Sequence, residues 1–287
     1  MASTSDLIDS GAEGEQLGSE IFSALLVEAA YARSIMLPLV QIEDMRGATS
    51  LVSSHLNMPK LAATSPGDGA DFANTAFDTT PVTATMDESG LMVCVSDIMV
   101  RRGAVKIVDY FTSLGRALGE YWDTDLTAEF ADFTLSETDT GNGMTADDFL
   151  GAIYDNENAN NQHYGDLVAV VHPITKDDLR KDIEASTGTI WGAGGGDSFV
   201  GANSQGTPLF GVPVFTSSTC ASVNSNADRQ GAMWPRGASL VTGIGMEPQS
   251  RRERDESLRA TELIVVAEYS HECINTDGGS KLIFDHE

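Results

Sequence analysis

The sequence predicts an α+β fold, and three observations support this prediction. The run DLVAVVHP is continuously apolar, as expected of a strand buried on both faces, and a capped helix is expected on each side of it. A long amphipathic helix is expected from Gly103 to Phe130, with one apolar stripe over about 40 Å. The C-terminal third holds extended runs, RATELIVVAEYS and KLIF. Helix, buried strand and helix form an α/β or α+β unit, and the surrounding elements favour the α+β class.

The first third of the chain predicts a helix, an edge strand and a hairpin. Four apolar residues recur at helical spacing after a polar, acidic arm: Phe22, Leu25, Leu26 and Ala29. In SIMLPLVQIEDM, Pro38 and branched residues favour an extended edge strand. Apolar residues alternate in PVTATMDESGLMVCVSD, which predicts two extended runs around a turn at residues 87–90. These two runs and the loose, polar sequence that precedes them form the block 47–96, which is predicted to be a long protruding hairpin. Segments of this kind are usually functional.

The rest of the chain predicts alternating helices and strands. The long helix carries its stripe on Val105, Val108, Phe111, Leu118, Trp122 and Leu126. Thr145 and Asp148 have the spacing of a capping box. The helix that begins at this capping box is expected to present Phe149, Ile153 and Tyr154 on its inward face. The helix after Pro173 is expected to present Leu179 and Ile183 on its inward face. TPLFGVPVFTSS is predicted to be one strand with Pro213 near its middle.

Composition limits the classes of function. The chain has 287 residues, 41% hydrophobic and 21% charged, which is typical of a globular protein with one large or two smaller domains. Its net charge of −26 should repel nucleic acid, because DNA-binding proteins neutralise phosphates with Lys and Arg. Cys94, Cys220 and Cys273 are too few and too far apart for a disulfide framework or a zinc knuckle, which favours synthesis in a reducing cytosol. No segment resembles a signal peptide or a membrane span, so we expect neither export nor a membrane partner.

The glycine-rich stretch TIWGAGGGDSFVG, residues 189–201, does not fit the glycine-rich motifs of catalytic or nucleotide-binding loops. A phosphate-binding loop needs Lys followed by Ser or Thr, and Asp197 stands where the cation is required. The dinucleotide pattern also fails at Asp197, and the spacing around Ser198 is one residue too long for a nucleophile elbow. His172 could in principle serve as the base for Ser198, but its place between a buried strand and a proline favours a structural role. We therefore expect a mobile glycine loop and no catalytic or cofactor-binding residues.

Metal binding is not expected either. The histidines show no pair at His-x-x-x-His spacing, and His271 with Cys273 lacks further ligands nearby in the sequence. Asp123, Asp125 and Glu129 could hold a weak cation, but a solvated helix face is the more common role of such residues. The sequence thus predicts no metal site.

One charged cluster has two interpretations from the residues alone. Its members are Arg251, Arg252, Glu253, Arg254, Asp255 and Glu256. It mixes both signs, unlike a basic patch for nucleic acid. It could be a solvated loop, or it could pair with symmetry copies of itself between subunits.

The order of these elements resembles the major capsid proteins of tailed phages, whose fold is named after phage Hong Kong 97. The resemblance covers about residues 18–284 and is supported by two short motifs, a strand ending in His-Pro before a helix and Gly-x-Pro-Val after a flexible loop. It implies an N-arm, an extended hairpin loop, a peripheral domain with a long spine helix, and an axial domain. We expect no long N-terminal scaffolding segment, since little sequence precedes the first helix.

The resemblance also implies boundaries. It assigns 1–33 to the N-terminal arm and first helix, 34–46 to a peripheral-domain strand, 47–96 to the extended loop, 97–130 to the peripheral domain with the spine helix, 131–243 to the axial domain, 244–270 to a peripheral-domain loop and long strand, and 271–287 to a return to the axial domain. The loop at 247–257 would meet its copies near three-fold positions. The glycine stretch would be a mobile loop of the axial domain.

The function implied is structural. Such a protein is not an enzyme and needs no cofactor; it assembles with itself as pentamers and hexamers into an icosahedral head that encloses double-stranded DNA without reading its sequence. A separate scaffold, a portal and a decoration protein are further partners that the resemblance allows. It also implies location in the virion after synthesis in the cytoplasm of a bacterial host. Two alternatives stay open: an encapsulin-like shell that holds cargo, and a soluble acidic hydrolase.

Overall fold

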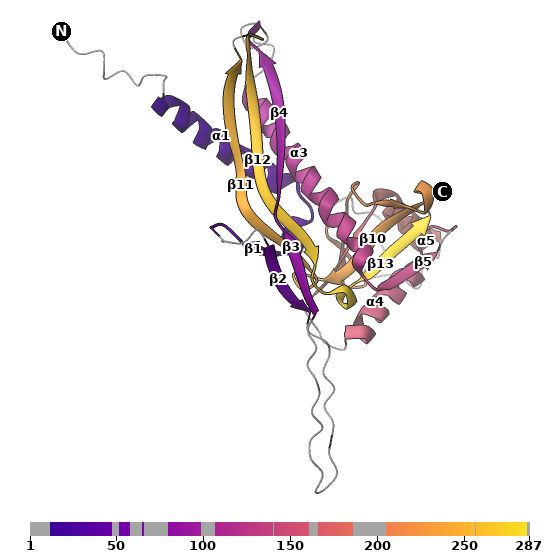
Figure 1. Ribbon diagram of the computed structural model, residues 1–287. Helices are drawn as coiled ribbons and strands as arrows, with labels where there is room; N and C mark the ends of the chain where they lie inside the picture. The colour runs from indigo at the N-terminus through magenta and orange to yellow at the C-terminus, as the bar shows by residue number, and fades with distance from the viewer. Residues whose placement is uncertain are drawn as a thin grey trace, which may run out of the picture. The chain divides into compact units, whose positions relative to one another are not determined.

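The structure is a computed structural model that describes residues 12–47, 52–57, 65, 80–98, 107–139, 141–160, 166–185, 205–255 and 257–285 (Figure 1). The chain forms two compact units. Unit 1 consists of Met1–Leu51, Met86–Leu126 and Thr242–Ser270, and unit 2 of Val52–Thr85, Thr127–Val241 and His271–Glu287. Each unit is therefore assembled from segments that are far apart in the sequence.

Unit 1 is built on a four-stranded sheet in the order β1-β11-β12-β4. The strands are β1 (Gln41–Asp44), β11 (Leu240–Asp255), β12 (Ala260–Cys273) and β4 (Asp87–Ser96). β4 runs antiparallel to β12, with pairs from Ala260↔Ser96 to Tyr269↔Asp87. The three long strands lie side by side in Figure 1.

Two helices, α1 (Ala12–Arg33) and α3 (Ile107–Ala128), pack against each other in unit 1. Gly115 and Gly119 of α3 permit this close approach, because an added Cβ atom would lie 2.6 Å from the Leu26 oxygen or 2.5 Å from the Ala30 oxygen. The buried Asp123 fixes the end of α1 by accepting hydrogen bonds from the Ser34 hydroxyl (2.6 Å) and from the Ile35 (2.9 Å) and Met36 (3.1 Å) amides. A 3-10 turn, η2 (Leu37–Leu39), leads from there to β1.

Both helices contact the same face of the unit 1 sheet. The Tyr269 hydroxyl of β12 donates to Asp125 of α3 (3.0 Å), and its ring packs edge-on against Trp122. A small cavity lined by Tyr31 of α1, Trp122 of α3 and Pro248 of β11 lies at this contact. The core beneath the sheet contains Leu26, Ala30, Phe111, Leu118, Leu126, Leu263, Val265 and Ala267.

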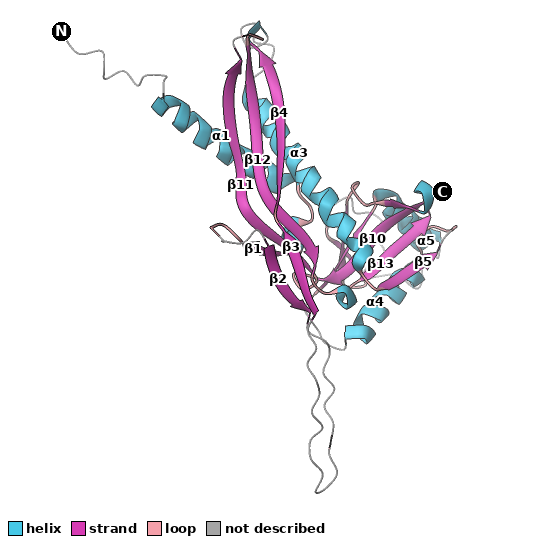
Figure 2. Cartoon of the chain, in the orientation of Figure 1, coloured by secondary structure: helices cyan, strands magenta, loops and turns pink. Residues whose placement is uncertain are grey.

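Unit 2 contains a seven-stranded mixed sheet with the order β5-β13-β10-β6-β8-β7, and β9 pairs with β10. Figure 2 labels β5, β13 and β10 of this sheet. Its strands are β5 (Leu135–Asp139), β13 (Ser280–Asp285), β10 (Asp228–Pro235), β6 (Leu167–Val171), β8 (Val212–Thr216), β7 (Thr207–Leu209) and β9 (Ser222–Val223). β13 runs parallel to β5 and β6 parallel to β8, whereas β10 is antiparallel to both β13 and β6.

Two helices, α4 (Ala146–Asn160) and α5 (Pro173–Ala185), share one core cluster with this sheet. Its largest members include Met144, Phe149, Leu179, Met233, Leu282 and Phe284. Unit 2 also holds a separate antiparallel pair, β2 (Val52–Asn57) with β3 (Thr80–Thr85), and the turns η3 (Glu129–Asp132), η4 (Asn224–Asn226) and η5 (Thr276–Gly278).

Several predicted elements are confirmed. The long helix lies within its predicted range, and Phe111, Leu118, Trp122 and Leu126 are buried. The capping box at α4 is formed: the Thr145 amide donates to Asp148 (2.9 Å), and the Asp148 amide donates to the Thr145 hydroxyl (3.3 Å). The inward positions Leu179 and Ile183 are buried, as is most of β6. β1 lies at a sheet edge, although Pro38 belongs to η2 rather than to the strand.

The predicted turn at residues 87–90 is wrong. These residues are the start of β4 and pair with Val266, Ala267, Glu268 and Tyr269 of β12, while β3 pairs with β2. The chain therefore changes partner at Met86 instead of reversing direction. Gly90 suits this position because a Cβ atom there would lie 3.0 Å from the Val265 oxygen.

Two further predictions are corrected. TPLFGVPVFTSS is not one strand, because Phe210 (φ 50°) and Gly211 (φ 90°) form a left-handed two-residue turn between β7 and β8. Tyr154 does not face inward and is 64% exposed, whereas Phe149 and Ile153 pack in the core of unit 2. Among the described residues, no helix combines the length and apolar character needed to cross a membrane.

Candidate functional site

The described residues give His172 a structural role. Its Nδ1 atom accepts a hydrogen bond from the Ile174 amide (3.2 Å), and its backbone oxygen accepts one from the Lys176 amide (3.1 Å). His172 thus caps the N-terminus of α5, which follows directly after β6. Ser198, its proposed partner, and the whole glycine-rich stretch 189–201 lie outside the described residues.

The charged cluster lies on a strand and not on a loop. Residues Arg251, Arg252, Glu253, Arg254 and Asp255 form the last part of β11, and Glu256 lies outside the described residues. The expected loop is therefore replaced by a long β-hairpin, because β11 extends to Asp255 and the neighbouring strand β12 begins at Ala260. The two interpretations of the cluster now depend on where each side chain lies.

Arg252 faces α1. Its guanidinium carbon lies 5.9 Å from the centre of the Phe22 ring, and that ring stacks on Phe111 of α3 (4.6 Å between centres). The preceding even-numbered residue, Ser250, faces the same way, because its amide and hydroxyl both lie 3.0 Å from the Ser23 hydroxyl. Arg252 therefore supports the contact between α1 and the sheet by a cation–π interaction.

Arg254 is held inside the subunit by Asp97, the residue that follows β4. Its two terminal nitrogens donate to the two Asp97 oxygens at 3.0 and 2.9 Å. This bidentate arrangement joins the ends of β11 and β4 across the hairpin. The same ion pair removes Arg254 from the set of residues best placed to contact another subunit.

Arg251 and Glu253 are both exposed and have the opposite orientation. Successive side chains of a strand alternate between the two faces, so these residues lie on the sheet face away from α1. Arg252, Arg254 and Asp255 make contacts within the subunit, so Arg251 and Glu253 are the described members of the cluster best placed for contact with another molecule.

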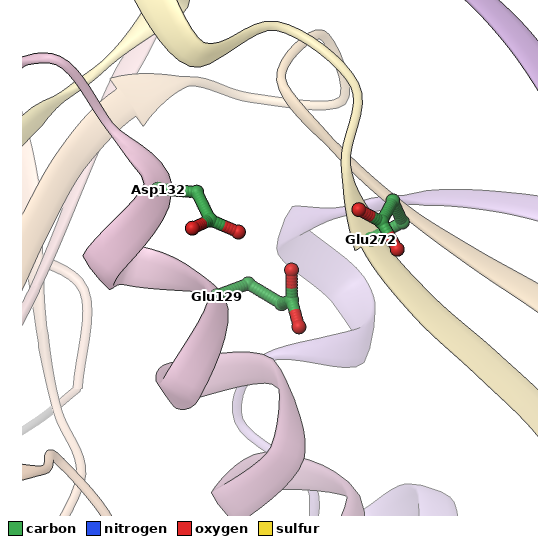
Figure 3. A group of neighbouring side chains, drawn as sticks. All are labelled: Glu129, Asp132 and Glu272. Carbon is green, nitrogen blue, oxygen red and sulfur yellow. The ribbon is translucent and has the colours of Figure 1, made fainter. Parts of the chain in front are cut away.

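A second cluster, of three carboxyl groups, lies in unit 2. Glu129, Asp132 and Glu272 place their oxygens within 4.8 Å of one another. Figure 3 shows Glu129 and Asp132 projecting toward each other from η3, with Glu272 opposite them on β12. Burial raises the pKa of Glu129 to about 7, and the charges of Glu272 and Asp132 act in the same direction. The Cys273 amide donates to Glu129 (3.2 Å).

Of the acidic residues considered for cation binding, only Glu129 belongs to this cluster. Asp123 caps the end of α1 and Asp125 accepts the Tyr269 hydroxyl, so neither is simply part of a solvated helix face. Glu272 was not recognised from the sequence, because a residue about 140 positions away gives no local spacing signal. Asp132 lies three residues after Glu129 and was not considered as a ligand. A group of acidic residues alone does not identify a metal site.

Comparison with known proteins gives a clear result at the level of structure. No protein-family model and no curated protein matches the sequence. A structure from Mycobacterium phage Che8 is 17% identical, with a TM-score of 0.68 over 87% of this chain and 90% of that one. The capsid of cyanophage Pam1 is 12% identical, with a TM-score of 0.66 over 88% and 92%.

A virus-like particle from Pyrococcus furiosus is also similar, with 10% identity and a TM-score of 0.61 over 92% of this chain and 99% of that one. At these identities the comparisons establish the fold. The chain has the Hong Kong 97-like α+β fold of the phage capsid proteins, as the element order predicts.

Proposed function

We propose that this chain is a major capsid protein that assembles as pentamers and hexamers into an icosahedral phage head around double-stranded DNA. The observation that carries the proposal is the likeness to phage capsid structures over nearly the whole length of both chains. The net charge of −26 is consistent with a shell that encloses DNA without binding it tightly, because acidic side chains repel the phosphates. The role is structural, and no catalytic chemistry is part of it.

The domain roles follow from the same proposal. Residues 1–33 would form the N-terminal arm and 47–96 the extended loop; 97–130 and 244–270 would belong to the peripheral domain, and 131–243 with 271–287 to the axial domain. The glycine-rich stretch would belong to the axial domain. The primary partner is the chain itself, with a scaffold, a portal and a decoration protein as further candidates. The protein would be made in the host bacterial cytoplasm and end in the virion.

One experiment tests the shell function directly. The purified protein is separated by size-exclusion chromatography, and the fractions are imaged by electron microscopy. A shell protein elutes as very large particles or as capsomers, whereas an acidic hydrolase would elute near its monomer mass of 30.5 kDa or as a dimer. Elution only as a monomer or dimer under all assembly conditions would contradict the proposal.

The likeness to a virus-like particle supports a second candidate, a cargo-holding shell of the same fold. Particles isolated from the natural source distinguish the two. A phage head contains DNA and carries a tail, while a cargo shell contains protein and has no tail. The nucleic-acid content of nuclease-treated particles therefore decides between them.

A further inference from the structure

The segment between β5 and α4 contains Asn142 followed by Gly143, which is the one Asn-Gly pair in the sequence. Glycine has no side chain and adopts many backbone conformations, so its backbone nitrogen can approach the side chain of the asparagine before it. Attack of this nitrogen on the carboxamide carbon forms a cyclic succinimide and releases ammonia. The surroundings of the two residues decide whether the folded chain favours this reaction.

The group that would be attacked, the Asn142 carboxamide, is exposed and is held by a neighbouring carboxylate. Its Nδ2 atom donates to the two oxygens of Asp139, at 3.2 and 3.1 Å. These hydrogen bonds restrict the rotation of the carboxamide. A reacting group whose geometry is already restricted loses less freedom on the way to the transition state.

The attacking group, the Gly143 backbone nitrogen, is not held by other parts of the protein. Among the residues that the structure describes, none accepts a hydrogen bond from the Gly143 amide. The pair Asp277-Gly278 shows the opposite arrangement, because Gly278 is buried and its amide donates to the Asn275 oxygen (3.1 Å). Of these two glycines, only Gly143 has a backbone nitrogen that is free to attack the preceding side chain.

A carboxylate oxygen of α5 lies beside Gly143. A Cβ atom at Gly143 would be 3.0 Å from Oδ2 of Asp178. This oxygen is buried and has no hydrogen-bond donor within the described part of the chain, while Oδ1 accepts from Lys181 (3.1 Å). A buried polar atom without a partner destabilises the fold, so its presence calls for an explanation. Here, Oδ2 can accept the proton that the Gly143 nitrogen loses during the attack.

We propose that Asn142, Gly143 and Asp178 form a site of self-modification, which converts Asn142 into aspartate and isoaspartate. The Gly143 nitrogen bonds to Cγ of Asn142, and Asp178 accepts its proton as a general base. The bond between Cγ and Nδ2 then breaks, and the leaving nitrogen takes up a proton from solvent and departs as ammonia. Asp178 releases its own proton to solvent.

Water completes the reaction by opening the succinimide. Addition at Cγ gives aspartate, and addition at the backbone carbon gives isoaspartate, in which the chain runs through Cγ. Either product places a carboxylate where Nδ2 donated to Asp139, so repulsion between like charges replaces two hydrogen bonds. The inference goes beyond the proposed shell function and does not depend on it.

The first test follows the modification in free subunits at neutral pH. Proteolytic peptides that contain residue 142 are analysed by mass spectrometry over time, and a protein isoaspartate methyltransferase detects isoaspartate. A synthetic peptide of residues 136–148 has the same sequence without the fold and serves as the reference. We expect the folded chain to convert Asn142 about tenfold or more faster than the peptide, because a positioned general base gives at least this acceleration. Conversion no faster than in the peptide would overturn the proposal.

The second test removes the base. We expect Asp178→Asn to slow the conversion about tenfold or more. Asp177→Asn is the matched control, because Asp177 also pairs with Lys181 (3.0 Å) but its side chain is 60% exposed, and this variant should convert at the wild-type rate. Asn142→Gln keeps an amide donor at this position and should show no conversion. Circular dichroism checks that each variant is folded, and equal rates in folded Asp178→Asn and Asp177→Asn would refute the role of Asp178.

Discussion

His172 stands between β6 and α5, where its Nδ1 atom accepts the Ile174 amide hydrogen. Alanine at this position leaves an amide of the first helical turn without that acceptor, so we expect His172→Ala to lose about 1 kcal/mol of stability. Asparagine can cap the helix in the same way, and His172→Asn should retain most of the stability. Urea unfolding of the three proteins measures the difference, and equal losses for Ala and Asn would contradict the capping role.

The same variant addresses catalysis. Combined with Ser198→Ala, His172→Ala should leave the yield and morphology of particles nearly unchanged. If the wild type hydrolyses a test ester and Ser198→Ala abolishes this activity, the enzyme interpretation is restored.

Glu129 gives a pH-dependent stability. Burial, together with Glu272 and Asp132, raises its pKa from 4.5 to about 7, so the folded state keeps a proton that the unfolded state releases. This contribution is fully present below about pH 4.5 and is lost as the pH rises through about 7. We expect Glu129→Gln, which stays uncharged, to reduce this loss of stability over that range.

The measurement is the free energy of unfolding of free subunits in urea at several pH values. Glu157→Gln, at an exposed position on α4, serves as the control and should keep the wild-type dependence on pH. If Glu129→Gln and the wild type lose stability equally between pH 5 and pH 7, another group is responsible.

At the scale of elements, the crossing of α1 and α3 depends on two glycines. A Cβ atom at Gly119 would lie 2.5 Å from the Ala30 oxygen, which is backbone and cannot move aside easily. We expect Gly119→Ala to destabilise the protein by about 1–3 kcal/mol through overpacking. The matched control is Gly151→Ala in α4, where the nearest atom is a Glu137 side-chain oxygen at 3.3 Å.

The control variant should be neutral or more stable, because alanine favours a helix over glycine by up to about 1 kcal/mol. Thermal melting compares the two. A Gly119→Ala protein as stable as the wild type would show that α1 can move away from α3 without cost.

The sequence predicts an element well where one face of it is continuously apolar. The stripe of α3 and the buried run of β6 give such patterns, and the structure confirms both. β10 was missed because Asp228, Gln230 and Gly231 interrupt its apolar pattern although all lie buried. Gly231 is required there by packing, since a Cβ atom would lie 2.6 Å from the Val170 oxygen.

Strand partners are harder to predict than strands. The alternation in Asp87–Ser96 is the same whether the strand pairs with β3 or with β12, so the sequence cannot choose between a local hairpin and a partner more than 150 residues away. The charged end of β11 gave no apolar alternation because it is exposed, and it was predicted to be a loop for that reason. The predicted contact residues Arg251, Arg252, Glu253, Arg254, Asp255 and Glu256 stay a prediction.

At the scale of the whole molecule, the strong acidity of the chain limits how copies can meet. With −26 charges per subunit, association requires local attraction that exceeds a general repulsion. Screening reaches about 10 Å at 0.1 M salt, so close contacts are only partly screened. We expect the neutral segment 251–256 to permit such attraction, because arginine of one copy can face carboxylate of another there.

A substitution at Arg251 best tests whether the charges of this segment contribute to contact between copies, because Arg251 lies on the face opposite Arg252 and α1. Arg251→Glu changes the segment from 0 to 2 − 4 = −2 without removing a described ion pair. We expect this variant to melt like the wild type and yet remain as free subunits or capsomers at low salt, since like charges in juxtaposition cost several kcal/mol.

Arg254→Glu is the informative comparison, because it places a second carboxylate beside Asp97. That variant should melt at a lower temperature even as a free subunit. Added salt should partly restore assembly of Arg251→Glu, because screening weakens repulsion between copies. Thermal melting and size-exclusion chromatography at two salt concentrations distinguish the two effects, and normal shells of Arg251→Glu at low salt would place this face of the hairpin away from any contact between subunits.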